Sequence, residues 1–100
     1  MVVLMTAKDA DEAQRIVRVL LEDKLIACGN ILREVKSLFW WEGKIDEAME
    51  SLVVMKAPHS KLPELTKKIK SLHSYSVPEI IALPIVGGNR EYLKWIDEST

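Results

Sequence analysis

The chain has 100 residues, of which 48% are hydrophobic and 29% charged, which supplies apolar material for one core and leaves no room for a second domain. Its net charge of -1, with acids and bases mixed along the chain, provides no basic stripe that could neutralise phosphates, so we expect no nucleic-acid partner. The only cysteine, Cys28, excludes an internal disulfide and a cysteine-rich zinc site within one chain. The apolar runs are far shorter than the ~20 residues of a spanning helix, and residues 1–5 lack the features of a signal peptide. We therefore expect a cytoplasmic protein without membrane contact.

The first third of the chain is predicted to form a strand followed by a helix. Residues 2–6 are an unbroken apolar run, typical of a strand that is covered on both faces. Asp9 and Glu12 have the spacing of a capping box, which marks the start of a helix. The apolar residues that follow recur on one helical face: Ala13, Ile16, Val17, Leu20 and Leu21.

Residues 26–41 and 44–57 are predicted to form a long hairpin. The first segment has no helical stripe and ends in strand-forming residues. Glu42 and Gly43 supply the turn, because glycine accepts the positive φ that a two-residue hairpin requires. The second half of the return strand is apolar on both faces and is expected to be buried, whereas the first half is expected to be more exposed.

The last part of the chain predicts a helix, a strand and a second helix. Pro58 ends the hairpin, and Ser60 is expected to cap a helix that ends near His73. Residues 77–86 are predicted as a strand with prolines near its ends, and Asn89 is expected to cap a short final helix. The order β-α-β-β-α-β-α predicts an α+β fold, the ferredoxin-like split β-α-β sandwich. We expect an antiparallel sheet, an extended hairpin and a C-terminal helix in a single domain over residues 1–100.

The predicted hairpin is longer than the domain that carries it. At ~3.4 Å per residue, sixteen strand residues span roughly 50 Å, whereas a compact 100-residue domain with a radius of gyration of ~13 Å is about 34 Å across. The tip carries Phe39, Trp40 and Trp41, and exposed aromatics on a projecting arm favour cover by another chain. We therefore expect an oligomer; the alternative is a bulge that folds the hairpin back onto its own sheet.

Four blocks carry a resemblance to a known family: residues 24–31, 39–45, 73–81 and 92–96. In order and spacing they resemble the CutA divalent-cation tolerance family, and with the first strand and helix they cover essentially the whole chain. The resemblance implies a ferredoxin-like protomer, a tight homotrimer built through the hairpins, and a fold shared with the PII-type signal proteins. It also implies an association with copper and divalent-cation tolerance. The chain departs from the family's pattern at Ser74, where proline is usual, at Ser76, where an acidic residue is common, and at Gly29, where a larger apolar residue is usual.

The candidate metal ligands are His73, Glu79 and Cys28. Imidazole nitrogen suits copper or zinc, carboxylate completes a site, and a thiol would add a soft ligand if it reached the same place. We expect Cu²⁺ rather than Zn²⁺ and no organic cofactor. The alternative for His73 is a helix-end residue that is bonded to a carbonyl and contributes little to the core. The alternative for Cys28 is a small buried hydrophobe.

Trp40, Trp41 and Tyr75 are predicted either to line a ligand pocket or to pack in a subunit interface. The sequence shows no set of nucleophile, base and orienting residue, so we expect no enzyme. The predicted function is that of a trimeric cytoplasmic protein that binds divalent metal and contributes to metal-ion response. The alternative is a PII-like trimeric regulator that holds a small ligand in clefts between subunits. Either function is compatible with a further protein partner, whose identity the sequence does not give.

Overall fold

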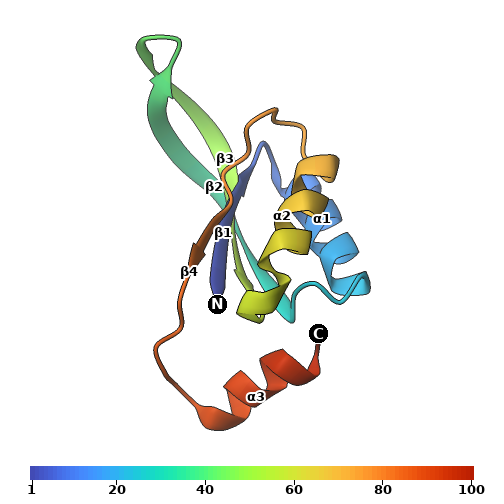
Figure 1. The fold of residues 1–100 in the computed structure, drawn as a ribbon. Coiled ribbons are helices and arrows are strands. Elements are labelled where there is room, and N and C mark those ends of the chain that lie inside the picture. The colour runs from blue at the N-terminus through green and yellow to red at the C-terminus, as the bar shows by residue number, and fades with distance from the viewer.

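The computed structural model describes all 100 residues and confirms the predicted order of elements (Figure 1). The four strands form one antiparallel sheet in the order β2-β3-β1-β4, which is the order of the ferredoxin-like fold. The elements are β1 (Val2–Ala7), α1 (Ala10–Glu22), β2 (Cys28–Trp41), β3 (Lys44–Lys56), the 3-10 helix η1 (His59–Lys61), α2 (Leu62–Leu72), β4 (Ile81–Leu83) and α3 (Arg90–Glu98).

Helices α1 and α2 lie together on one face of the sheet and bury the core against it (Figure 1). The start of α1 is fixed as predicted, because the Asp9 side chain accepts a hydrogen bond of 2.8 Å from the Glu12 amide. Strand β1 alternates between buried and half-buried residues, with the buried set facing the helices. The core contains Val3, Met5, Ala13, Ile16, Leu20, Val53, Met55, Leu65 and Ile69.

The other face of the sheet has no covering layer in this chain. Residues paired directly across antiparallel strands share a face, and most of the paired residues on this face are apolar, with Thr6, Asn30 and Lys56 as polar members. The exposed fractions of Leu32, Ile81 and Leu83 are 45%, 49% and 46%. Strand β1 was predicted to be covered on both faces, but within one chain it is covered on one. We call this surface the open face and define it as Val2, Leu4, Leu32, Leu52, Val54, Ile81 and Leu83.

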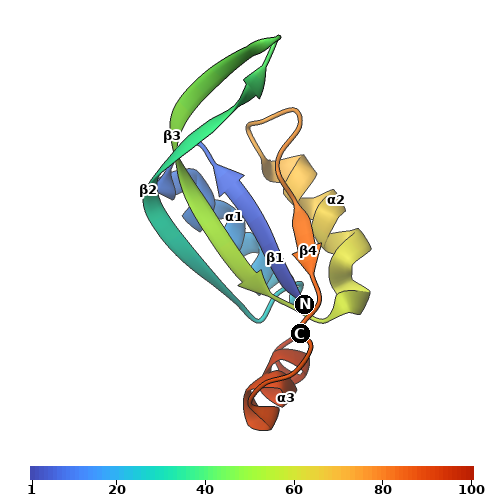
Figure 2. The same ribbon diagram turned by 90° about the vertical axis from the view of Figure 1, so that its left-hand side faces the viewer.

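The hairpin of β2 and β3 projects beyond the rest of the domain, as predicted (Figures 1 and 2). The chain measures 44 × 25 × 22 Å, so its long axis is much longer than the other two. A bulge between Leu32 and Val35 interrupts the pairing without folding the hairpin back, because the register resumes and continues to the tip. At the turn Glu42 and Gly43 have φ of 50° and 77°, the left-handed conformation of a two-residue hairpin.

Two predicted details near α2 and β4 are wrong. Ser60 does not cap α2; it lies within η1, and Lys61 precedes the helix without a side-chain cap. The strand predicted over residues 77–86 is reduced to β4, because Pro78 and Pro84 flank it and a proline donates no hydrogen bond to a ladder.

The final helix is capped as predicted, since the Asn89 side chain accepts a hydrogen bond of 3.0 Å from the Glu91 amide. Helix α3 lies beyond the end of the sheet rather than in the layer of α1 and α2 (Figure 2). No helix of the chain combines the length and apolar character needed to cross a bilayer.

Candidate functional site

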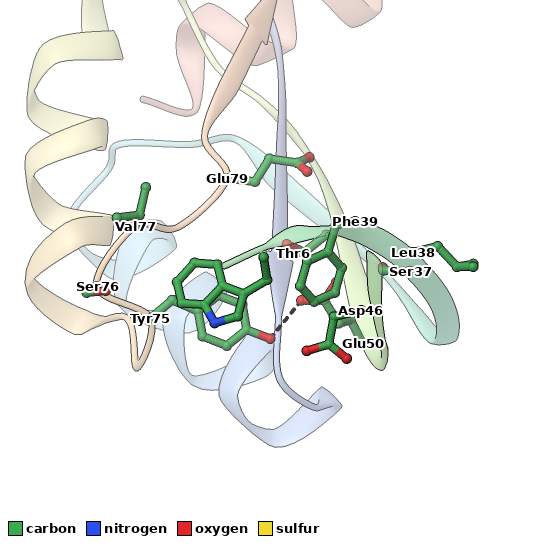
Figure 3. A pocket seen from close by; sticks show the side chains of 11 residues that line it. Thr6, Ser37, Leu38, Phe39, Asp46, Glu50, Tyr75, Ser76, Val77 and Glu79 are labelled. Carbon is green, nitrogen blue, oxygen red and sulfur yellow. Dashed lines mark hydrogen bonds between the residues drawn. The ribbon is translucent and has the colours of Figure 1, made fainter. Parts of the chain in front are cut away.

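A cavity of about 740 Å³ lies between the hairpin and the segment that connects α2 to β4 (Figure 3). We call it the hairpin pocket. The hairpin contributes Phe39, Trp41, Asp46 and Glu50 to its lining, the connecting segment contributes Tyr75, Val77 and Glu79, and β1 contributes Thr6. The pocket therefore joins residues that are up to 73 positions apart in the sequence.

Strand register places the hairpin residues of the pocket on one face. Phe39 pairs with Asp46, and Trp41 follows Phe39 by two positions, so these side chains point the same way. Glu50 continues this face along β3. Trp40 lies on the opposite face and is 73% exposed. The two neighbouring tryptophans that the sequence grouped together thus have different surroundings: Trp41 lines the pocket and Trp40 faces outward.

Tyr75 and Glu50 connect the two walls of the pocket. The Tyr75 hydroxyl donates a hydrogen bond of 2.7 Å to Glu50 Oε2, as Figure 3 shows. Burial of the phenol raises the pKa of Tyr75, and the bond to the Glu50 carboxylate raises it further. The phenol therefore stays protonated and remains a hydrogen-bond donor.

The connecting segment is held in place by a buried carboxylate of α1. Glu12 accepts hydrogen bonds from the amides of Lys8, at 3.1 Å, and Ser74, at 2.9 Å. Burial opposes ionisation of this carboxyl, but the hydrogen bonds from Ser74 and Lys8 outweigh it and lower the pKa of Glu12. This ionised residue ties α1, the end of β1 and the wall of the pocket together.

The side chain of His73 is buried and takes part in hydrogen bonds that hold the fold together. Its side chain is fully buried, Nε2 lies 2.8 Å from the carbonyl oxygen of Thr6, and Nδ1 accepts a hydrogen bond of 3.0 Å from the Tyr75 amide. Because Nδ1 is an acceptor, Nε2 carries the proton that it donates to Thr6. The expectation that this residue contributes little to the core is wrong, since it bonds β1 to the connecting segment through both ring nitrogens.

The structure does not bring the three predicted metal ligands together in one chain. Cys28 begins β2 at the other end of the sheet, and its Sγ lies 3.6 Å from the hydroxyl of Tyr92. Glu79 lines the hairpin pocket. No group of three or more His, Cys, Asp or Glu side chains is placed to hold a metal ion. Metal binding by His73, Glu79 and Cys28 stays a prediction, and a complete site would need donors from a second chain.

Asp46 is the acidic residue of the pocket that sequence reasoning missed. The signal was present in the turn: a two-residue turn at Glu42 and Gly43 fixes the register, which pairs Phe39 with Asp46. The bulge near Arg33 and Glu34 hides the alignment farther down the hairpin.

The fold and the pocket define a ferredoxin-like α+β protomer with a projecting hairpin and an open apolar sheet face. The family model of the "CutA1 divalent ion tolerance protein" matches residues 1–99. The chain belongs to this family.

Several relatives show the same similarity over the whole chain. The divalent-cation tolerance protein CutA of Thermus thermophilus is 43% identical over 99 residues, which cover 99% of this chain and 96% of that protein. Its solved structure matches with a TM-score of 0.97 over 99% of this chain and 96% of that chain. The structure of the periplasmic divalent cation tolerance protein CutA from Archaeoglobus fulgidus is 46% identical, with a TM-score of 0.95 over 98% of this chain and 95% of that one. Protein CutA 1, chloroplastic, of Oryza sativa is 42% identical over 99% of this chain, which spans only 56% of the rice protein.

Proposed function

We propose that the protein is a homotrimer that acts in divalent-cation tolerance by binding divalent metal, with Cu²⁺ as the expected ion and without a catalytic reaction. The observation that supports assembly is the open face, because a soluble monomer seldom leaves a contiguous group of apolar residues uncovered on one face of its sheet. The outward side of the hairpin adds exposed apolar residues, among them Trp40 and Ile45. Three copies are the number that the family resemblance implies.

Sedimentation equilibrium at micromolar concentration tests the assembly. The expected result is one species of about three times the protomer mass of 11.4 kDa. A single 11.4 kDa species at that concentration would overturn the trimer.

The metal part of the proposal places the binding site between subunits. Carboxylate and imidazole are donors that Cu²⁺ accepts, but one chain supplies no group of three suitable side chains. Glu79 is the predicted ligand that lines a cavity, whereas a nitrogen of His73 becomes available only if a bond to Thr6 or Tyr75 breaks. Assembly would bring donors of a neighbouring chain toward Glu79.

Calorimetric titration with Cu²⁺ tests this proposal on the assembled protein. Glu79→Gln should weaken binding about tenfold or more if its carboxylate is a ligand. His73→Ala should also weaken binding if the imidazole is recruited, and His59→Ala, at an exposed residue, should not. Absence of saturable Cu²⁺ binding by the parent protein would overturn the metal function. Unchanged affinity in His73→Ala together with lower thermal stability would assign His73 a purely structural role.

The second candidate function is a PII-like regulator that binds a small ligand between subunits. The hairpin pocket favours it, because the pocket adjoins the open face where other protomers would pack. A cytoplasmic location is part of both proposals, and cell fractionation tests it. A regulator should gain affinity for a protein partner when its ligand is bound, whereas a tolerance protein should bind metal without a partner.

A further inference from the structure

We propose that the hairpin pocket binds a small organic cation with several separated positive charges, of the alkyl polyamine class. The proposal goes beyond metal binding and beyond the unspecified ligand of a PII-like regulator. It rests on the charge of the pocket, on one buried carboxylate and on the aromatic residues beside it.

The pocket is acidic and has no positive group of its own. Asp46, Glu50 and Glu79 line it, and no lysine or arginine does. The ion pairs of the chain lie elsewhere, and none includes these three carboxylates. A cation that enters the pocket therefore meets three acids that have no ion-pair partner within the chain.

Of the three acidic side chains in the pocket, Glu50 is the most buried and gains most from a bound cation. It is only 8% exposed, and the chain gives it one side-chain hydrogen bond, from Tyr75 to Oε2. No fully buried side-chain oxygen or nitrogen of the chain lacks a partner, so the other oxygen, Oε1, is open to the pocket and has no donor in the chain. A carboxylate that is largely shielded from water gains more from a positive partner than an exposed one does. An ammonium group at Oε1 would supply that partner.

Aromatic side chains stand close to the acids. Phe39 pairs across the hairpin with Asp46, and Figure 3 shows both on the same side of the pocket as Glu50. Trp41 and Tyr75 also contribute to the lining. The faces of such rings attract ammonium and guanidinium groups and pack against alkyl chains. A ligand with methylene segments between its charges uses both properties of this wall.

The spacing of the acids favours an extended ligand over a bare ion. The three carboxylates share one cavity, yet no three acidic or imidazole groups are close enough to hold a metal ion. A cavity of about 740 Å³ also exceeds the needs of a single ion. A polyamine suits this arrangement, because its separated ammonium groups can pair with carboxylates that do not converge on one point.

Calorimetric titration of the full chain with spermidine tests the proposal. The parent should show saturable binding, and Glu50→Gln should weaken it about tenfold or more, because a charge-assisted hydrogen bond is lost. Glu47→Gln is the matched control: it removes the same charge from the same strand, but Glu47 pairs with Lys36 outside the pocket. Its effect should stay below about twofold. Equal losses in the two variants would reduce the effect to general charge attraction and overturn the proposal.

If Glu50→Gln does not fold, variants at two exposed residues of the pocket, Asp46 and Phe39, still test the proposal. Asp46→Asn should weaken spermidine binding severalfold, and Phe39→Leu should weaken it about two- to fivefold by removing the ring face. Normal affinity in both variants would overturn the proposal, as would complete competition by Mg²⁺ at equal ionic strength. A parent protein that binds no spermidine would also overturn the proposal, and weakening of the trimer by Asp46→Asn in sedimentation would then assign the acids of the pocket to the contact between copies.

Discussion

At the scale of single residues, the buried Glu12 carboxylate sets the position of one wall of the hairpin pocket. Its hydrogen bond from the Ser74 amide requires a residue with a backbone N–H at position 74. Proline, the residue that the family resemblance leads us to expect at this position, has no such group. The departure at Ser74 therefore gives this chain a bond that a proline would not make.

Replacing Ser74 by proline should lower the free energy of unfolding by about 1 to 3 kcal/mol, because the buried Glu12 carboxylate loses a donor. His73 has extended backbone angles that tolerate a following proline, so the loss would not come from the preceding residue. Ser74→Ala keeps the amide and removes only the hydroxyl, which also helps to lower the pKa of Glu12, so this variant should lose less stability than Ser74→Pro. Urea unfolding at one fixed protein concentration measures both, and equal stabilities would contradict this role of the amide.

Glu12 should also make stability depend on pH in the acid range. Its pKa is lowered on folding from the ordinary 4.5, so its contribution is fully present above that pH and is lost as the pH falls through the lower folded value. Glu12→Gln should remove this part of the dependence and cost about 1 to 3 kcal/mol at neutral pH. Urea unfolding at a series of pH values below about 5 would show the difference. Parallel profiles for the parent and the variant would contradict it.

Gly29 marks a close approach between β2 and α1. A methyl group added at this residue would lie 2.8 Å from Cγ1 of Val17, too close for an unperturbed helix. Gly29→Ala should therefore destabilise the protein by about 1 to 3 kcal/mol. Adding Val17→Ala should recover part of that loss, which a double-mutant cycle by thermal or urea unfolding would reveal as coupling. Additive losses would show that the contact is not the cause.

Local sequence patterns correctly predicted the role of residues whose hydrogen-bond partners lie close to them in the sequence. Asp9 and Asn89 cap their helices because a cap is made within three residues. His73 was misjudged because its partner, the carbonyl of Thr6, is 67 residues away, and no local pattern reports that contact.

At the scale of elements, the hairpin turn contains one residue that does not favour its conformation. Glu42 has φ of 50°, where residues other than glycine, asparagine and aspartate are disfavoured. Glu42→Asn should raise the free energy of unfolding by roughly 0.5 kcal/mol, since Asn-Gly suits this turn best. Gly43→Ala should lower it by about 1 kcal/mol at φ of 77°. Thermal unfolding ranks the three proteins, and no gain in Glu42→Asn would indicate that the tip is fixed by contacts outside the turn.

The predicted boundaries of strands and helices were correct where one sequence signal determined them, and they were wrong where two signals disagreed. The hairpin was predictable because its apolar strands flank a glycine turn. Strand β4 was predicted too long because the apolar residues between Val77 and Val86 were given more weight than the two prolines. Pro78 and Pro84 lack the N–H groups that strand pairing needs, which limits the strand. Ser60 had the residue type of a cap, but η1 occupies the position where the cap would lie.

At the scale of the whole molecule, the protomer has a helix-covered face and an open face. The sequence predicted an overlong hairpin but not the open face, because a continuous apolar run in β1 indicates burial without saying which chain provides it. The hairpin pocket adjoins the open face through Thr6, next to β1's open-face residues. Assembly through this face would therefore also affect access to the pocket.

A charge on the open face should disrupt the assembly, whereas the same charge on the helix side should not. In the proposed trimer, Leu32→Glu would place a carboxylate among apolar residues of neighbouring chains, which costs several kcal/mol for each buried charge without a partner. We expect sedimentation equilibrium to shift toward the 11.4 kDa protomer in this variant. Leu21→Glu is the matched control, because Leu21 is a comparably exposed leucine on α1.

If separated protomers are unstable, the loss of structure in Leu32→Glu should diminish as protein concentration rises, since assembly and folding are then linked. Circular dichroism at several concentrations detects this, and Leu21→Glu should show no such dependence. Leu32→Glu that sediments with the mass of the parent would show that the open face is not the contact between copies, and that the projecting hairpins alone hold them together.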